Sequence, residues 1–271
     1  MVLGKADTLP IMIRLYVEGY PKAMTSAQLR VVTDAGVELT EDVWWSPATK
    51  EQLEAMTISE VAEEAWWSAA KRMRLRWSGT RDYPVLLVND CIHTLMGRLT
   101  GHEGYRGIAL QPQEVGIVIK RLRRIRGLSS RGKLVVARLT ECLRWANHIG
   151  ICLVQDGPDR RRRDRIQVHE CFHLFQYRNR LHRCRTPKAL LKHPAASKAI
   201  PSLKTQYDVS NAAKVVVEMA AYIFSGDHAY IGLRRQEAED WLSTYFRQYR
   251  CEAPGLGPLK KVVHAIQSNH R

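Results

Sequence analysis

The sequence contains few cysteines, and they lack the patterns of disulfide scaffolds. There are six cysteines in 271 residues, and no two of them form a C-x-x-C pair. Small disulfide-bonded proteins contain cysteine at a much higher density. We therefore expect reduced thiols and an intracellular setting.

The sequence also lacks an apolar run long enough to span a bilayer, which takes about 20 residues. Near the N-terminus, Arg14 and Glu18 interrupt the stretch that would have to serve as the apolar core of a signal peptide. Internal repeats and low-complexity tracts are absent as well. These observations predict a cytoplasmic protein without a transmembrane segment.

Acidic residues are scarce relative to basic ones. The chain has 27 Asp and Glu against 42 Lys and Arg, which gives a formal net charge of +15. Such a surface favours polyanions, acidic proteins or anionic membranes. Basic residues gather in two clusters, one from Arg121 to Arg126 and one from Arg160 to Arg165. We predict that any association with nucleic acid uses these two clusters.

One short motif carries recognisable chemistry: His169, Glu170 and His173 form a His-Glu-x-x-His spacing within a predicted helix. Helical residues four apart lie one above the other, so the two imidazoles can face one metal ion. The Glu170 carboxylate leaves the helix on a neighbouring line, where it can hold and deprotonate a water molecule. The alternative is an amphipathic helix with two histidines at the boundary of the core.

A catalytic zinc ion usually takes three protein ligands. The metzincin spacing requires a third histidine at the position of Asn179, so that pattern fails. Glu218 is a better candidate, because it is the only charged residue between positions 215 and 224. A buried carboxylate without a partner is costly, and a bound cation removes that cost. Pairing with an arginine is an alternative for this glutamate, and His182 and His193 are alternative third ligands.

The sequence His169-Glu170-x-x-His173, followed by Glu218-x-x-Ala221, resembles the gluzincin branch of the zincin metallopeptidases. The third zinc ligand of that branch is a glutamate on a second helix. The resemblance implies that His169, His173 and Glu218 bind Zn²⁺ and that Glu170 is the general base. It covers about 60 residues, and it implies nothing about the substrate.

A zinc peptidase also needs a proton donor or an oxyanion stabiliser opposite the base. Tyr222, His228 and Tyr230 follow Glu218 closely in the sequence. They are the candidates for this role, and the sequence does not choose among them.

The apolar patterns predict a helix-rich α+β fold, and the resemblance implies a zincin-like domain with a small mixed sheet bordering the active-site helix. We assign residues 1–79 to an N-terminal region of uncertain fold and residues 80–271 to the catalytic domain with a basic C-terminal tail. The strand predicted at residues 149–155 is the expected edge strand of the cleft, where an extended peptide can pair.

Several connections around the motif are predicted to be irregular. Residues 101–107 form a glycine-punctuated loop, and residues 156–165 form a turn that carries five arginines. Asp164 is then the predicted cap of the metal-binding helix. The proline-interrupted segment 178–207 is expected to be a long excursion with one short helix, and it serves either as a lid or as a passive connector.

These observations predict a zinc-dependent metallopeptidase that acts on a protein or peptide substrate. The basic cluster at the predicted mouth of the site favours acidic substrate segments. Two alternatives belong to other classes. One is a basic nucleic-acid-binding protein, in which the two arginine clusters form one patch and the motif is a coincidence. The other is a zincin-like interaction module that binds zinc and cleaves nothing.

Overall fold

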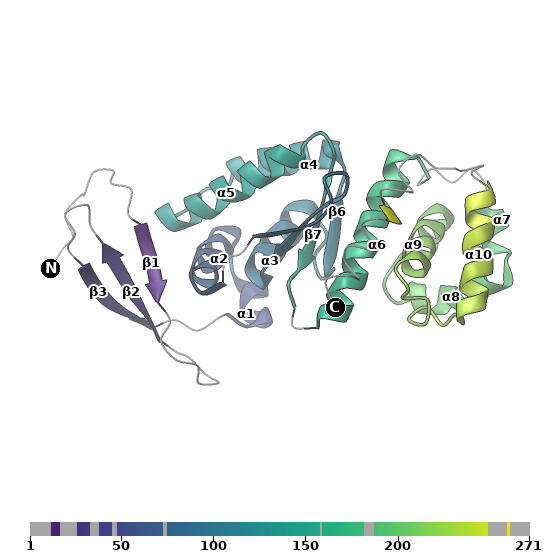
Figure 1. Ribbon diagram of the computed structural model, residues 1–271, viewed down its shortest axis with the longest axis horizontal. Coiled ribbons are helices and arrows are strands. Elements are labelled where there is room, and N and C mark those ends of the chain that lie inside the picture. The colour runs from purple at the N-terminus through teal and green to yellow at the C-terminus, as the bar shows by residue number, and fades with distance from the viewer. Residues whose placement is uncertain are drawn as a thin grey trace.

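The computed structural model describes residues 12–16, 26–32, 38–44, 48–72, 75–157, 159–181, 187–248 and 259–260. Within these ranges the chain is rich in helix and contains a four-stranded mixed sheet (Figure 1). The predicted α+β class is therefore confirmed. None of the helices in the described ranges is both long and apolar enough to cross a membrane.

The secondary-structure elements follow one another in a mixed order along the chain. The strands are β1 (Met12–Tyr16), β2 (Ser26–Val32), β3 (Glu38–Trp44), β4 (Arg76–Gly79), β5 (Pro84–Val88), β6 (Gly107–Leu110) and β7 (Ile151–Gln155). The helices are α1 (Lys50–Ala55), α2 (Ile58–Arg72), α3 (Asp90–Thr100), α4 (Pro112–Arg123), α5 (Ser130–Ala146), α6 (Arg160–Arg178), α7 (Pro187–Leu191), α8 (Pro194–Lys204), α9 (Ala212–Phe224) and α10 (Arg235–Gln248).

The central sheet has the strand order β4-β5-β7-β6. Strands β5 and β7 run parallel, while β4 and β6 pair antiparallel on the two outer sides. Strand β7 is therefore interior, and the prediction that residues 149–155 form the edge of the cleft is wrong. All residues from Ile151 to Val154 are fully buried. Such a continuous apolar run is typical of a strand that is covered on both faces.

The edge of the sheet next to α6 is β6. This strand starts at Gly107, which pairs with Val154 of β7, and it lies against α6. It begins at the last glycine of the segment that was predicted as a loop. Four residues carry too little alternation to be recognised as a strand from the sequence.

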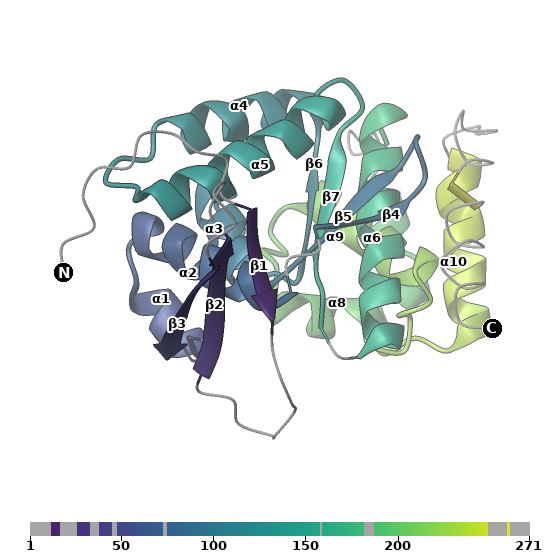
Figure 2. The ribbon, with the colours of Figure 1, turned by 60° about the vertical axis from the view of Figure 1, so that its left-hand side comes forward.

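Side chains of the sheet alternate between two hydrophobic cores. On β5, Val85 and Leu87 belong to the core formed with α6 to α10, while Leu86 and Val88 belong to the core formed with α1 to α5. Figures 1 and 2 show these two groups of helices on opposite sides of the sheet. Helices α6 and α9, which carry the predicted metal ligands, are in the same layer.

Helix α6 begins at Arg160, earlier than predicted. Its N-cap is Asp159, whose side chain accepts a hydrogen bond of 3.0 Å from the Arg162 amide. The capping role predicted for Asp164 is wrong, because this residue lies in the second turn and accepts a hydrogen bond from Gln167 Nε2. The arginine run is thus helical and does not form a turn. Arginine favours helices, so a capping aspartate before the run is enough to start one.

The segment from residue 178 to 207 is more regular than predicted. It contains α7 and α8, whose first residues are Pro187 and Pro194. Proline is favoured at the first helical position, because the amide hydrogen that it lacks would have no partner within the helix. Two of the prolines that were taken as breakers therefore start helices. Residues 182–186 lie outside the described part of the chain.

The N-terminal region contains an antiparallel sheet of order β1-β2-β3, followed by α1 and α2. From residue 48 onward the region packs on one of the two cores, because Leu53 of α1 and Val61 of α2 are buried there. Strand β4 then joins the central sheet. The domain boundary at residue 80 stays a prediction. Most of the basic C-terminal tail lies outside the described residues.

Candidate metal centre

Two histidines of α6 face the same point in the interior. His169 and His173 are one helical turn apart, and their Nε2 atoms are separated by 3.0 Å. Both residues are buried, with exposed fractions of 9% and 8%. The helix that carries them packs on β6 and β7 of the central sheet. Both imidazoles are therefore held in a fixed layer of the protein.

The neighbouring helix α9 brings a carboxylate to the same point. The Oε2 atom of Glu218 lies 3.5 Å from His169 Nε2 and 3.4 Å from His173 Nε2. Glu218 is the only acidic residue of α9, which packs on α6 and in which Glu218 is the only charged residue after Lys214. The structure thus brings together the three residues that were predicted as metal ligands, although 45 positions separate the second histidine from the glutamate.

The separations between these three atoms suit a common metal ion. Ligand atoms about 2.0–2.1 Å from a tetrahedral metal lie about 3.3 Å from one another. In addition, Glu218 Oε2 is buried and has no hydrogen-bond partner among the described residues. A bound cation would satisfy this charge. The group could therefore hold a metal ion, and its donors suit several first-row metals, zinc among them.

The alternative third ligands have different positions. His193 is the N-cap of α8, where its Nδ1 accepts a hydrogen bond of 3.2 Å from the Ala195 amide. His182 lies outside the described residues. Asn179 is the C-cap of α6. Within the described ranges, the two histidines of α6 and Glu218 are the one group of three potential ligands, with donor atoms within 4.8 Å of one another.

A buried glutamine orients one of the imidazoles. Gln176 Oε1 lies 2.8 Å from His173 Nδ1, and its Nε2 donates hydrogen bonds to Val217 O and to Tyr245 Oη. Since this amide nitrogen is used as a donor, Oε1 must accept a hydrogen bond from the Nδ1–H of His173. In the neutral form of His173, the lone pair of the imidazole is then on Nε2, which faces Glu218. Metal-binding histidines are commonly oriented by such a second partner.

Burial and charge shift the protonation of the ligands. Burial alone would lower the pKa of His173, but the Glu218 carboxylate outweighs it and raises this pKa to about 9. Burial alone would raise the pKa of Glu218, whereas His173 and His169 hold it well below its ordinary value. At neutral pH the metal-free group therefore contains an ionised carboxylate and a protonated His173.

The Glu170 side chain lies between α6 and the edge strand. A Cβ atom added to Gly107 would be 2.5 Å from Glu170 Oε1 and 2.6 Å from its Cγ, so the glutamate occupies the space that a side chain would need. Burial raises the pKa of Glu170, although the two neighbouring histidines partly offset this effect. Glycine at position 107 thus permits the close approach of β6 to the predicted base.

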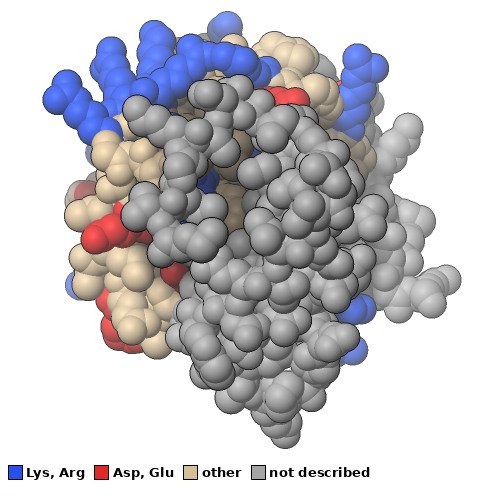
Figure 3. Space-filling model, turned by 90° about the vertical axis from the view of Figure 1, so that its left-hand side faces the viewer, with Lys and Arg blue, Asp and Glu red and all other residues tan. Residues whose placement is uncertain are grey.

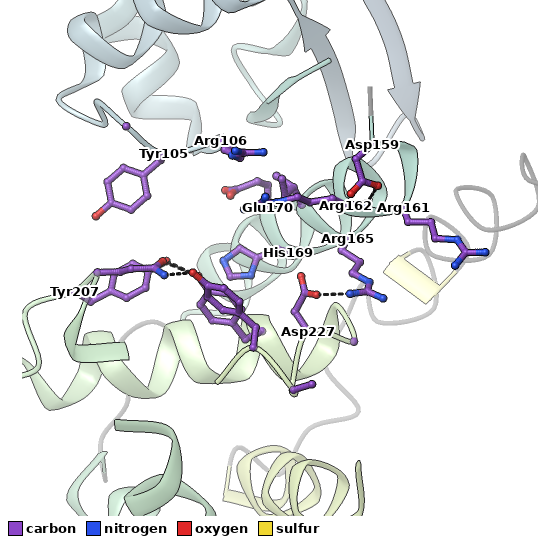
Figure 4. Close-up of a pocket in the computed structure, with 18 of the residues that line it drawn as sticks. Tyr105, Arg106, Asp159, Arg161, Arg162, Arg165, His169, Glu170, Tyr207 and Asp227 are labelled. Carbon is purple, nitrogen blue, oxygen red and sulfur yellow. Dashed lines mark hydrogen bonds and ion pairs between the residues drawn. The ribbon is translucent and has the colours of Figure 1, made fainter. Parts of the chain in front are cut away.

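A cavity of about 1090 Å³ opens beside this group. His169 and Glu170 line it, and its walls come from the segment before β6, from α6, from the α8–α9 connection and from the end of α9. Figure 4 shows Glu170 and His169 between Tyr105 and Arg106 on one side and Tyr207 on the other. Four tyrosines and four arginines contribute to the lining: Tyr105, Tyr207, Tyr222, Tyr230, Arg106, Arg161, Arg162 and Arg165.

Tyrosine hydroxyls form one wall of the cavity. The Tyr222 ring packs against His169 with 4.7 Å between the ring centroids, and its hydroxyl donates a hydrogen bond of 3.1 Å to Gln206 Oε1. Tyr207 Oη lies 3.3 Å from Tyr222 Oη. Tyr230 stacks on Tyr222 and accepts a hydrogen bond from Gln206 Nε2. Both predicted tyrosines therefore line the cavity.

The third candidate for the proton donor has another position. His228 does not line the cavity, and its Nδ1 lies 3.0 Å from Leu233 O.

Tyr207 lies next to Tyr222 in the cavity wall, and it was not among the candidates. It precedes α9 in the sequence, whereas the predicted candidates all follow Glu218. The contact between Gln176 and His173 could have been predicted from the sequence, since helical residues three apart are neighbours on the helix surface.

Comparisons with protein families, with curated proteins and with solved structures find no match to this chain. The fold and the site define an α+β protein with a buried His-His-Glu group beside a large cavity. The resemblance to gluzincins therefore rests on the motif alone.

Loss of the orienting glutamine should weaken metal binding. In Gln176→Met, His173 loses its acceptor at Nδ1, and we expect metal affinity to fall by about 10- to 100-fold. Competition with a chromophoric chelator measures this affinity. Gln167→Met is the matched control, because Gln167 is a buried glutamine of the same helix that bonds to Ser78 instead. Equal effects of the two substitutions would contradict the orienting role.

Metal binding at pH 7 should release about one proton, because the metal displaces the proton from His173, whose pKa is about 9. The apparent affinity should then rise with pH, by up to about tenfold per unit, and level off near pH 9. Calorimetry in buffers of different ionisation enthalpy measures the released proton. His193→Ala should leave it unchanged, and equal affinities at pH 7 and pH 9 would refute the coupling.

Proposed function

We propose that the protein is a zinc-dependent metallopeptidase. His169, His173 and Glu218 would hold the zinc ion, and Glu170 would be the general base. One observation carries this proposal: a group of three donors fits a metal, and one of its members, His169, lines a large cavity together with the buried carboxylate of Glu170 from the same helix. A structural metal site is normally closed by a fourth protein ligand, and no fourth donor belongs to this group among the described residues.

Each residue of the cavity has a distinct role in this mechanism. Zinc at the site would polarise the scissile carbonyl and lower the pKa of a water molecule. Glu170 accepts the proton of that water and transfers it to the leaving amine. Its raised pKa favours this exchange, because a more basic carboxylate accepts a proton more readily. Gly107 restricts the position of the Glu170 side chain from the other side.

The tyrosine wall supports stabilisation of the oxyanion. Burial raises the pKa of Tyr222 to about 12 and also raises the pKa of the neighbouring Tyr207, so both hydroxyls stay protonated at neutral pH. The Tyr222 hydroxyl donates to Gln206 Oε1 in the structure, so it would turn from this acceptor to a substrate oxyanion. Hydroxyl donors held beside the reacting carbonyl are effective at stabilising a developing negative charge. We assign this role to Tyr207 and Tyr222 together.

The edge strand and the arginines support an acidic peptide as the substrate. Strand β6 is an edge of the sheet and its first residue, Gly107, lines the cavity, and an extended peptide can pair with such an edge. Three arginines of the lining, Arg106, Arg161 and Arg162, have no acidic partner among the described residues, whereas Arg165 pairs with Asp227 at 2.9 Å. Carboxylate side chains of a substrate would be suitable partners for the unpaired guanidinium groups.

Replacement of Glu170, the proposed general base, should abolish peptide hydrolysis without affecting zinc binding. In Glu170→Gln we expect one tightly bound zinc per chain, as in the wild type, and a loss of peptide hydrolysis. Elemental analysis and cleavage of a broad peptide library measure the two properties. A wild-type protein without bound metal would refute the proposal. Bound zinc without turnover in the wild type would favour the interaction module instead.

Replacement of cavity arginines should affect acidic substrates selectively. For Arg106→Gln and Arg162→Gln we expect KM to rise about tenfold for peptides with Asp or Glu near the scissile bond, as a lost charge-assisted hydrogen bond would cause. KM for alanine-substituted peptides should change little. Arg160→Gln is the matched control, since Arg160 starts the same helix and does not line the cavity. An equal rise for both peptide classes would exclude recognition of the acidic side chain.

A further inference from the structure

Two tryptophans lie side by side on the surface, away from the candidate metal centre. Trp77 of β4 and Trp145 of α5 are 44% and 49% exposed, and their ring centroids are 5.0 Å apart in an edge-to-face arrangement. Tryptophan is mostly buried in proteins, and exposed pairs are uncommon. Packing of the core therefore does not account for this pair.

The pair forms part of a groove with cationic walls. A cavity of about 860 Å³ is lined by both indoles and by Arg81 and Arg138. Arg138 precedes Trp145 by seven residues, so both side chains project from the same face of α5. Among the described residues, Glu141 is the only acidic one that lines the groove. The groove thus combines flat aromatic surfaces with positive charge.

The groove lies beside a strongly basic part of the described surface. Residues 112–146, which contain α4 and α5, include nine Lys and Arg and only two Glu. Figure 3 shows Lys and Arg side chains gathered along the top of the molecule, where these two helices lie. Arg123, Lys133 and Arg144 line a second hollow between α4 and α5. Helix α5 has 17 residues and is about 25 Å long, so it links the two hollows.

This surface is separate from the candidate metal centre. Helices α4 and α5 belong to the core on one face of the sheet, and α6 and α9 to the core on the other. The cluster at residues 121–126 therefore does not form one patch with the cluster at residues 160–165. The cluster at residues 121–126 lies beside α5, which also carries Trp145 of the groove.

We propose that the α4–α5 surface and the groove at Trp77 and Trp145 bind single-stranded nucleic acid. Arginine and lysine neutralise phosphates, while exposed aromatic side chains stack on bases irrespective of sequence. Stacking requires bases that are not already paired in a duplex, so the two tryptophans favour a single strand. This binding would not need the metal ion.

Anisotropy of a fluorescent 15-nucleotide single strand tests the base-stacking role. We expect Trp145→Ala to weaken binding about tenfold or more, while Trp145→Phe, which keeps an aromatic face, retains most of the affinity. Leu134→Ala is the matched control, because Leu134 is 61% exposed on the same helix and lies outside both hollows. Thermal unfolding verifies that each variant is folded. Equal affinities of the three variants would overturn the proposal.

A second comparison tests the charge. Arg138→Gln with Arg144→Gln should weaken binding and reduce the salt dependence, by about 0.7 in the logarithmic slope for each phosphate contact that is lost. Arg160→Gln with Arg234→Gln changes the net charge equally, on residues that line neither hollow, and should have little effect. Equal losses in the two double variants would indicate non-specific attraction and overturn the proposed site.

Two further measurements identify the partner. Duplex DNA of the same length should bind more weakly than the single strand, and a metal chelator should leave binding unchanged. Anionic phosphatidylserine vesicles should bind without dependence on Trp145. A duplex that binds as tightly as the single strand, or vesicle binding that is lost in Trp145→Ala, would contradict recognition of unpaired bases. Because binding is also measured with a chelator, the outcome for nucleic acid does not depend on whether the protein is a zinc peptidase.

Discussion

The arrangement of the candidate site depends on one buried charge. Glu218 carries the only acidic side chain of α9 into the interior, where two imidazole nitrogens lie within 3.5 Å of its Oε2 atom. Removal of a carboxylate from water is costly unless a cation compensates it. A protonated His173 does so in the metal-free protein, and a metal ion would do so more completely. Both the unusual pKa values and the ligand geometry follow from this constraint.

The surrounding fold keeps the group in position and open on one side. The apolar face of α6 packs on the sheet, and Gln176 fixes the ring of His173 from behind. The edge strand β6 approaches closely only because position 107 is glycine. On the open side, tyrosines and arginines line a cavity of about 1090 Å³. The group thus has rigid support on one side and access from the cavity on the other.

The sequence predicted the ligand group because its signals are local and strong. An i,i+4 histidine pair and a lone glutamate in an apolar helix each have a direct physical meaning. The start of α6 was predicted wrongly, because Asp164 and Gln167 have the spacing of a capping box although Asp159 is the N-cap. The edge strand was predicted wrongly, because β6 has only four residues. Tyr207 was missed for another reason. Its place beside Tyr222 depends on how α8 and α9 pack, which spacing along the chain does not encode.

X-ray absorption at the zinc edge of the purified protein identifies the atoms that bind the metal. We expect two imidazole nitrogens at about 2.0–2.1 Å, one carboxylate oxygen at about 2.0–2.2 Å and one water ligand. Glu218→Gln should alter the oxygen shell and leave both nitrogens. Sulfur ligands at about 2.3 Å, or a protein that binds no zinc at all, would contradict the assignment of His169, His173 and Glu218 as a metal site.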